Sequence, residues 1–101
     1  MKIFRQYTPP STTDLAKLKG ELGLTGEQMA QLAAVAGSNQ WRKYTGGHAP
    51  RELSLHMLFL IAARLTLSEQ EFERIIKKMR DLGASVDFSE MDGGPASPPS
   101  S

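Results

Sequence analysis

The sequence predicts an all-α fold of five helices. Apolar residues recur at intervals of three, four and seven positions, as they do on one face of a helix. Side chains that cap helices precede several of these segments, and glycines follow them. The 101 residues, 40% of them hydrophobic, suffice for one modest core. We therefore expect an N-terminal arm at residues 1–10, one helical domain at residues 11–83 and a C-terminal extension at residues 84–101.

The composition excludes several kinds of site. The chain has no cysteine, which excludes disulfides, thiolate zinc sites and cysteine nucleophiles. Its two histidines, His48 and His56, fall in different predicted elements, so we expect neither a metal ion nor another cofactor. The sequence contains no phosphate-binding loop. Ser38 and His48 are the one potential pair of nucleophile and base, but both are expected at loop ends, and we regard their proximity in the sequence as a coincidence. We therefore do not expect an enzyme.

Neither the apolar runs nor the N-terminus suggest a membrane protein. The longest apolar run, at residues 55–63 and interrupted by His56, is far too short to span a bilayer. The first ten residues, MKIFRQYTPP, lack the apolar region and small residues of a signal peptide. We expect a cytoplasmic protein with no membrane partner.

The net charge of +1 hides an uneven distribution of charge. The segment from residue 84 onward has three acids and no base, so residues 1–83 carry 12 minus 8, or +4. Within that part, residues 28–51 contain three bases, Arg42, Lys43 and Arg51, and no acid. A local basic surface is suited to neutralising phosphates, although charge alone does not reject an ordinary solvated face.

The first ten residues are predicted to form an extended arm or a short edge strand. Ile3, Phe4 and Tyr7 alternate weakly, and the segment ends in Pro9 and Pro10. The arm can lie against the domain, a partner subunit or DNA, and the sequence leaves these three options open.

The first helix is predicted to begin near residues 11–13, whose hydroxyls can cap it, with Asp14 in the first turn. Leu15, Leu18 and Leu22 form one apolar stripe, and Gly23 favours a stop. We expect a helix whose role is packing.

The second helix is predicted to begin with a capping box, because Gln28 follows Thr25 by three positions. Its buried stripe should contain Met29, Leu32 and Ala33, and its several alanines suit a close helix crossing. Residues 35–37 are predicted to make the turn to the third helix.

The third helix is predicted to cover residues 38–46, with Ser38 as its N-cap and Gly46 and Gly47 at its end. If Trp41 and Tyr44 face the core, a spacing of 100° per residue exposes a polar stripe on the opposite side. The stripe contains Asn39, Arg42, Lys43 and Gly46, with Gln40 beside it. These side-chain types can pair with base edges and reach phosphates, whereas the simpler reading is a solvent-facing helix.

The fourth and fifth helices are expected to complete the core. Ser54 can cap a helix at residues 55–65 that is apolar on nearly every side and is therefore predicted to be central. Ser68 and Glu71 form a second capping box for a helix at residues 68–82, which Gly83 ends. The apolar stripe of this last helix should complete the core, although part of it can instead be a dimer surface. Its members are Phe72, Ile75, Ile76, Met79 and Leu82.

The C-terminal extension divides into two parts. Residues 84–88 have a short strand-like pattern that can pair with residues 3–7 of the arm. The chain from about residue 92 is predicted to be disordered, because it consists of glycine, proline, alanine and serine with one acid.

The segment from residue 24 to residue 65 resembles the lambda-repressor-like family, the Cro and phage-repressor type also called Xre. The matching features are Leu24 and Thr25 before the second helix, an aromatic followed by glycine at the end of the third, and a Ser54-led fourth helix after Pro50. An ungapped alignment places the family's two apolar positions of the third helix on Gln40 and Lys43. One extra residue in the turn at 35–37 moves them to Trp41 and Tyr44, which avoids burying an unpaired lysine.

The resemblance implies a five-helix DNA-binding domain and a transcriptional regulator, expected to be a repressor, that binds double-stranded DNA with helix 38–46 in the major groove. It also implies a homodimer on a palindromic operator. Carried over by position, the base-reading candidates are Asn39, Gln40, Arg42 and Lys43. The candidates for contacts with the DNA backbone are Thr25, Gln28, Ser38, His48 and Arg51. The alternative is a protein-interaction module, such as an antitoxin or adaptor, that uses the surface of helix 68–82.

Overall fold

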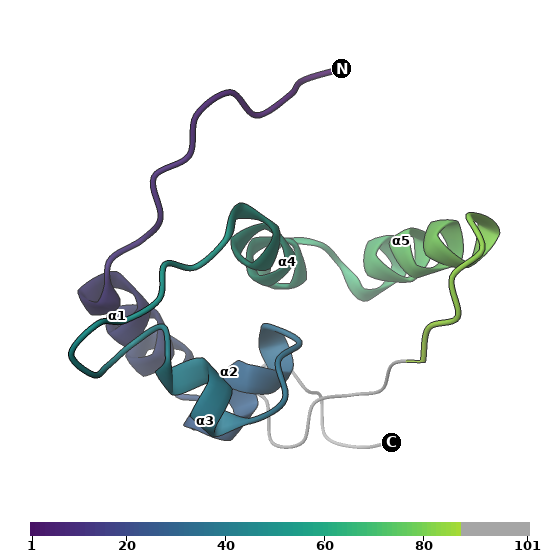
Figure 1. The fold of residues 1–101 in the computed structure, drawn as a ribbon. Coiled ribbons are helices and arrows are strands. Elements are labelled where there is room, and N and C mark those ends of the chain that lie inside the picture. The colour runs from purple at the N-terminus through teal and green to yellow at the C-terminus, as the bar shows by residue number, and fades with distance from the viewer. Residues whose placement is uncertain (88–101) are drawn as a thin grey trace.

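Five helices and no strand make up residues 1–87, the part of the chain that the computed structural model describes (Figure 1). They are α1 (Thr12–Leu22), α2 (Gly26–Leu32), α3 (Ser38–Arg42), α4 (Leu55–Thr66) and α5 (Glu69–Asp81). The predicted all-α class and the number of helices are confirmed. The predicted disorder of the C-terminal tail concerns residues outside the described part.

The helix starts follow the capping residues of the sequence. Thr25 and Ser68 begin α2 and α5 with the predicted capping boxes, and the Ser54 hydroxyl accepts a hydrogen bond from the Met57 N–H at the start of α4. Ser11 and Asp14 form a further capping box at α1, where only a cap had been expected. Each box satisfies two polar groups that a helix end would otherwise leave unpaired.

The core lies between α1, the α2–α3 pair and one side of α4. Leu15, Met29, Trp41, Leu53 and Ile61 are each at most 2% exposed and belong to one cluster of buried residues. Leu18 and Leu22 pack against that cluster, so the predicted stripe of the first helix is confirmed. The predicted stripe of α2 is also confirmed, since all three of its members are buried.

The prediction that the fourth helix is central was wrong. Only Ile61 of α4 is buried, whereas Phe59 is 57% exposed and Leu65 is 46% exposed. An apolar composition on all sides does not by itself supply neighbours on all sides, and α4 packs on the core along one side only.

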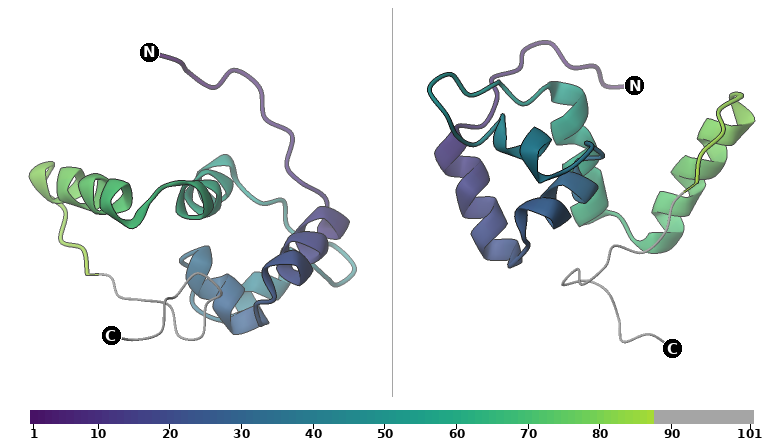
Figure 2. Two further views of the ribbon diagram at one scale, coloured as in Figure 1. Left: turned by 180° about the vertical axis from the view of Figure 1, so that it is seen from behind. Right: turned by 60° about the horizontal axis from the view of Figure 1, so that its bottom comes forward.

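The prediction that the fifth helix completes the core was also wrong. α5 extends away from the group formed by the other four helices in every view (Figures 1 and 2). Ile76 is its one buried residue and lies outside the core cluster, while Ile75, Met79 and Leu82 are exposed. Arg64 of α4 contacts both α2 and α5. Its guanidinium donates to the Gln31 carbonyl of α2 and lies 5.5 Å from the centre of the Phe72 ring of α5.

The arm contacts the domain at two residues, which is one of the three options that the sequence left open. The Tyr7 hydroxyl donates to the Leu53 carbonyl at 2.5 Å, and the Phe4 and Phe59 rings meet edge to face with centroids 5.9 Å apart. Burial raises the pKa of Tyr7, and the Glu52 carboxylate raises it further, so the hydroxyl remains a donor.

The predicted strand pairing between residues 3–7 and 84–88 was wrong. Residues 3–7 and 84–87 contain no strand, and Phe88 lies outside the described residues. The arm residues that suggested the pairing have different partners, because Phe4 contacts Phe59 of α4 and Tyr7 bonds Leu53 in the segment before α4.

Candidate nucleic-acid interface

The α2–α3 pair is held by a tight turn and a close helix crossing. α2 ends at Leu32, and Ala34 then adopts a left-handed conformation with φ of 58°. The Val35 N–H donates to the Ala30 carbonyl at 2.9 Å, which reverses the chain after α2. A Cβ built on Gly26 would meet the Cβ of Ser38 at 3.5 Å, so the two helices touch where each begins.

The start of α3 differs from the prediction. Gly37, in an extended conformation, is the N-cap of α3, and no side chain caps it from that position. The Ser38 N–H instead donates to the Glu27 carboxylate at 3.1 Å. The predicted role of Ser38 as N-cap was therefore wrong, because a carboxylate from α2 satisfies this helix end in its place.

The helix itself is also shorter than predicted, since α3 ends at Arg42 rather than at residue 46. The Lys43 and Tyr44 N–H groups donate to carbonyls three residues back, and the Thr45 and Gly46 N–H groups both donate to the Arg42 carbonyl. The chain therefore continues as tight turns up to Gly46. Tyr44, Thr45 and the two glycines that follow all have lower helix propensity than alanine or leucine, which is consistent with this early end.

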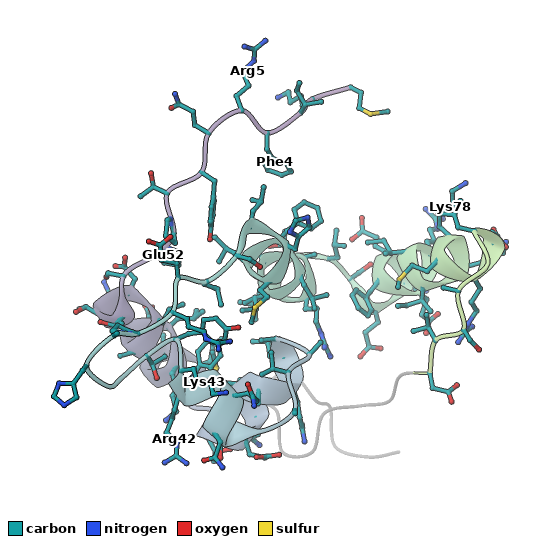
Figure 3. All side chains as sticks on the ribbon, viewed as in Figure 1. Phe4, Arg5, Arg42, Lys43, Glu52 and Lys78 are labelled. Atoms are coloured by element: carbon teal, nitrogen blue, oxygen red, sulfur yellow. The ribbon has the colours of Figure 1, made fainter. Side chains whose placement is uncertain are left out.

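The two aromatic residues face inward as predicted. Trp41 is 1% exposed and lies in the core, and the half-buried Tyr44 packs against it. Their placement leaves Asn39, Arg42 and Lys43 exposed and Gln40 half-buried. Figure 3 shows Arg42 at the lower edge of the view and Lys43 over the region of α3, whereas Lys78 lies on α5 at the right of the view. The structure thus brings the four base-reading candidates together on α3 and the residue after it.

Two of these candidates are hydrogen-bonded to each other. The Arg42 guanidinium donates from Nη2 to the Asn39 side-chain oxygen. Pairing of an asparagine with adenine needs that oxygen as an acceptor, so the contact uses one of the two lone pairs on the group that Asn39 would need. Arg42 has five N–H donors and keeps others for a ligand. The pair therefore favours Arg42 as the group presented outward and Asn39 as the group that orients it.

The candidates for backbone contacts lie in two places: at the adjoining starts of α2 and α3, where Ser38 is half-buried beside Gly26, and on the loop after α3. Thr25 and Gln28 form the capping box of α2, in which the Gln28 N–H donates to the Thr25 hydroxyl at 3.1 Å and the Thr25 N–H donates to the Gln28 side chain at 2.9 Å. His48 and Arg51 are exposed on the loop after α3. The Arg51 N–H donates to the Lys43 carbonyl at 2.7 Å, which holds the far end of this loop beside the end of α3.

Sequence reasoning missed one charged residue of this surface. Residues 28–51 contain no acid, but Glu27 directly precedes them and its carboxylate lies at the start of α3. A carboxylate there opposes the approach of a phosphate to the same helix end. The signal in the sequence was only its position one residue outside the acid-free segment, which did not indicate contact with a residue 11 positions later.

Among residues 1–87, no three histidine or carboxylate side chains lie close enough together to hold a metal ion. No helix in the same range is both long and apolar enough to cross a membrane. Comparison with known proteins gave no matching family model, no matching curated protein and no matching solved structure.

Proposed function

We propose that the protein is a sequence-specific DNA-binding transcriptional regulator, and specifically a repressor with a lambda-repressor-like fold. The observation that carries the proposal is the α2–α3 pair, in which Trp41 anchors a short helix whose outer residues Asn39, Arg42 and Lys43 are polar or basic and exposed. The proposed binding mode places α3 and the turns up to residue 46 in the major groove, which is wide enough to admit a helix.

The residues have distinct roles in this binding mode. Arg42 pairs with a guanine edge through its remaining N–H donors, and Asn39 holds its guanidinium in place. Lys43 and Arg51, joined through the backbone hydrogen bond between them, neutralise phosphates on one side of the groove. Gln40, Thr25, Gln28, Ser38 and His48 remain candidates at the edge of the contact. A homodimer would present two such surfaces to a palindromic operator.

The proposal is tested first by selection from a random DNA library with the full chain. An enriched palindrome is expected, and its half-site spacing would give the distance between the two α3 helices. If binding enriches no sequence, the protein is not a sequence-specific regulator.

Two variants then separate base reading from phosphate binding. On the selected operator, Arg42→Ala should cost about 1–3 kcal/mol and relax the preference at one base pair. Arg51→Ala should weaken binding to all sequences alike and reduce its salt dependence. Lys17→Ala removes an exposed base from α1 and serves as the control that leaves affinity unchanged. Equal losses on every sequence for both interface variants would remove Arg42 as a reader.

A protein-interaction module is the second candidate, and the exposed apolar residues of α5 favour it. A protein that shows no salt-sensitive affinity for any DNA, but retains a partner through α5, would support this candidate instead.

A further inference from the structure

One face of α5 is apolar, and beyond Phe72, which is half-buried and contacted by Arg64, much of it is exposed in the described structure. Ile75 and Met79 are each 40% exposed and Leu82 is 75% exposed, although all three belong to the apolar stripe of the helix. α5 stands apart from the other four helices (Figure 2). An exposed stripe of this kind marks a surface for association.

The spacing of the stripe is that of a helix–helix seam. Phe72, Ile75, Met79 and Leu82 are separated by three, four and three positions. This is the a and d spacing with which two helices pack side by side, each inserting its apolar residues between those of the other. The occupant that matches the face is therefore another helix with the same spacing.

The charges of α5 select the direction of that second helix. Glu69, Glu71 and Glu73 lie in its first half with one base, Arg74, so that half carries a net −2. Lys77, Lys78 and Arg80 lie in its second half with one acid, Asp81, which pairs with Lys77, so that half carries a net +2. Two copies of α5 in a parallel arrangement would place acids beside acids and bases beside bases. In an antiparallel arrangement, the acidic half of each copy lies along the basic half of the other, which is favourable.

We propose that α5 pairs antiparallel with the α5 of a second copy of this chain, about a two-fold axis near the middle of the helix. If a large apolar side chain offers on the order of 200 Å², the exposed fractions of Ile75, Met79 and Leu82 provide roughly 300 Å² per chain. A stable interface buries at least about 1,200 Å² in total. The pair is therefore a weak dimer that forms as the protein concentration rises.

This inference names the surface of the homodimer within the proposed function, but it rests on α5 alone. Its tests contain no DNA, so their failure leaves DNA binding by a monomer intact, and a failure to bind DNA leaves the dimer intact.

The first test is sedimentation velocity of the full chain from about 1 μM to about 1 mM. The wild type should shift from monomer to dimer over this range, and Met79→Glu should remain monomeric with unchanged helical circular dichroism. Ile3→Glu adds the same charge to an exposed apolar residue of the arm, 73% exposed, and should dimerise like the wild type. A wild type that is monomeric throughout, which would leave the face to a different protein, overturns the proposal. A dimer that survives Met79→Glu overturns it as well.

The second test establishes the direction, and it uses the absence of native cysteine. Glu69→Cys and Leu82→Cys place single thiols at opposite ends of α5, 13 positions and about 20 Å apart along a helix. If the pair is antiparallel, mild oxidation of a mixture of the two variants should form mainly the disulfide that joins a Glu69→Cys chain to a Leu82→Cys chain. Predominant disulfides within each variant alone indicate a parallel pair and overturn the proposed arrangement.

Discussion

The turn between α2 and α3 contains a conformation that its residue tolerates poorly. Ala34 has φ of 58° and is the one non-glycine residue with positive φ among residues 1–87. The left-handed conformation costs an L-residue about 1–2 kcal/mol. Replacing alanine by glycine removes that cost but adds about 0.5–1 kcal/mol of backbone entropy lost on folding. Because the Ala34 side chain is exposed, little packing is lost, and Ala34→Gly should stabilise the fold by about 0.5–1 kcal/mol.

Ala16→Gly provides a matched control with the opposite expected sign. Ala16 is also exposed, but it lies inside α1 in a right-handed helix, where glycine should cost about 0.5–1 kcal/mol. Urea denaturation at 25 °C measures both changes, and for a domain of this size 1 kcal/mol shifts the melting temperature by about 4–8 °C. If Ala34→Gly destabilises the protein as much as Ala16→Gly does, then position 34 is not left-handed and the reasoning about the turn is refuted.

Two further predictions concern carboxylates at helix starts. Glu27→Gln keeps an acceptor for the Ser38 N–H but removes a negative charge, so DNA affinity should rise about two- to fivefold at low salt and less at high salt. Glu21→Gln on α1, also exposed, should change it little, and equal gains would contradict a local effect. The pKa of Asp14 is lowered, first by the Ser11 backbone N–H and then by its hydroxyl. Its stabilising effect is therefore full above the ordinary pKa of about 4 and is lost as the pH falls through the lower folded value. The stability difference between wild type and Asp14→Asn, followed by thermal melts, should shrink as the pH falls below about 4, and a constant difference would contradict this origin.

The sequence alone predicted the features that depend on residues a few positions apart in the chain. A capping box needs a hydroxyl and an acceptor three residues later, and both Thr25 with Gln28 and Ser68 with Glu71 form as expected. The inward placement of Trp41 was equally predictable, since turning α3 the other way would bury Lys43. These features depend on spacings of three or four residues, which the sequence displays directly.

Features that depend on contacts between distant segments were not predictable in the same way. Glu27 satisfies the start of α3 from 11 positions away, so the assignment of Ser38 as the cap failed. The spacing of apolar residues in α5 identified its apolar face, but it did not show which element, if any, packs against that face. Ile75 and Met79 were expected in the core and are exposed, because α5 stands away from it.

The position of α3 in the candidate site depends both on local residue spacing and on contacts with segments far away in the sequence. A helix of five residues has almost no stability of its own, because isolated helices shorter than about 12–15 residues are marginal in water. Three contacts with the rest of the domain hold α3 in place instead. Its Trp41 side chain packs in the core, the Glu27 carboxylate accepts from the N–H at its start, and the Arg51 N–H donates to the carbonyl of Lys43 directly after its end. The direction of the Arg42 guanidinium therefore depends on the packing of the whole domain. Such an interface is oriented before any ligand arrives, so binding need not supply the free energy of ordering α3.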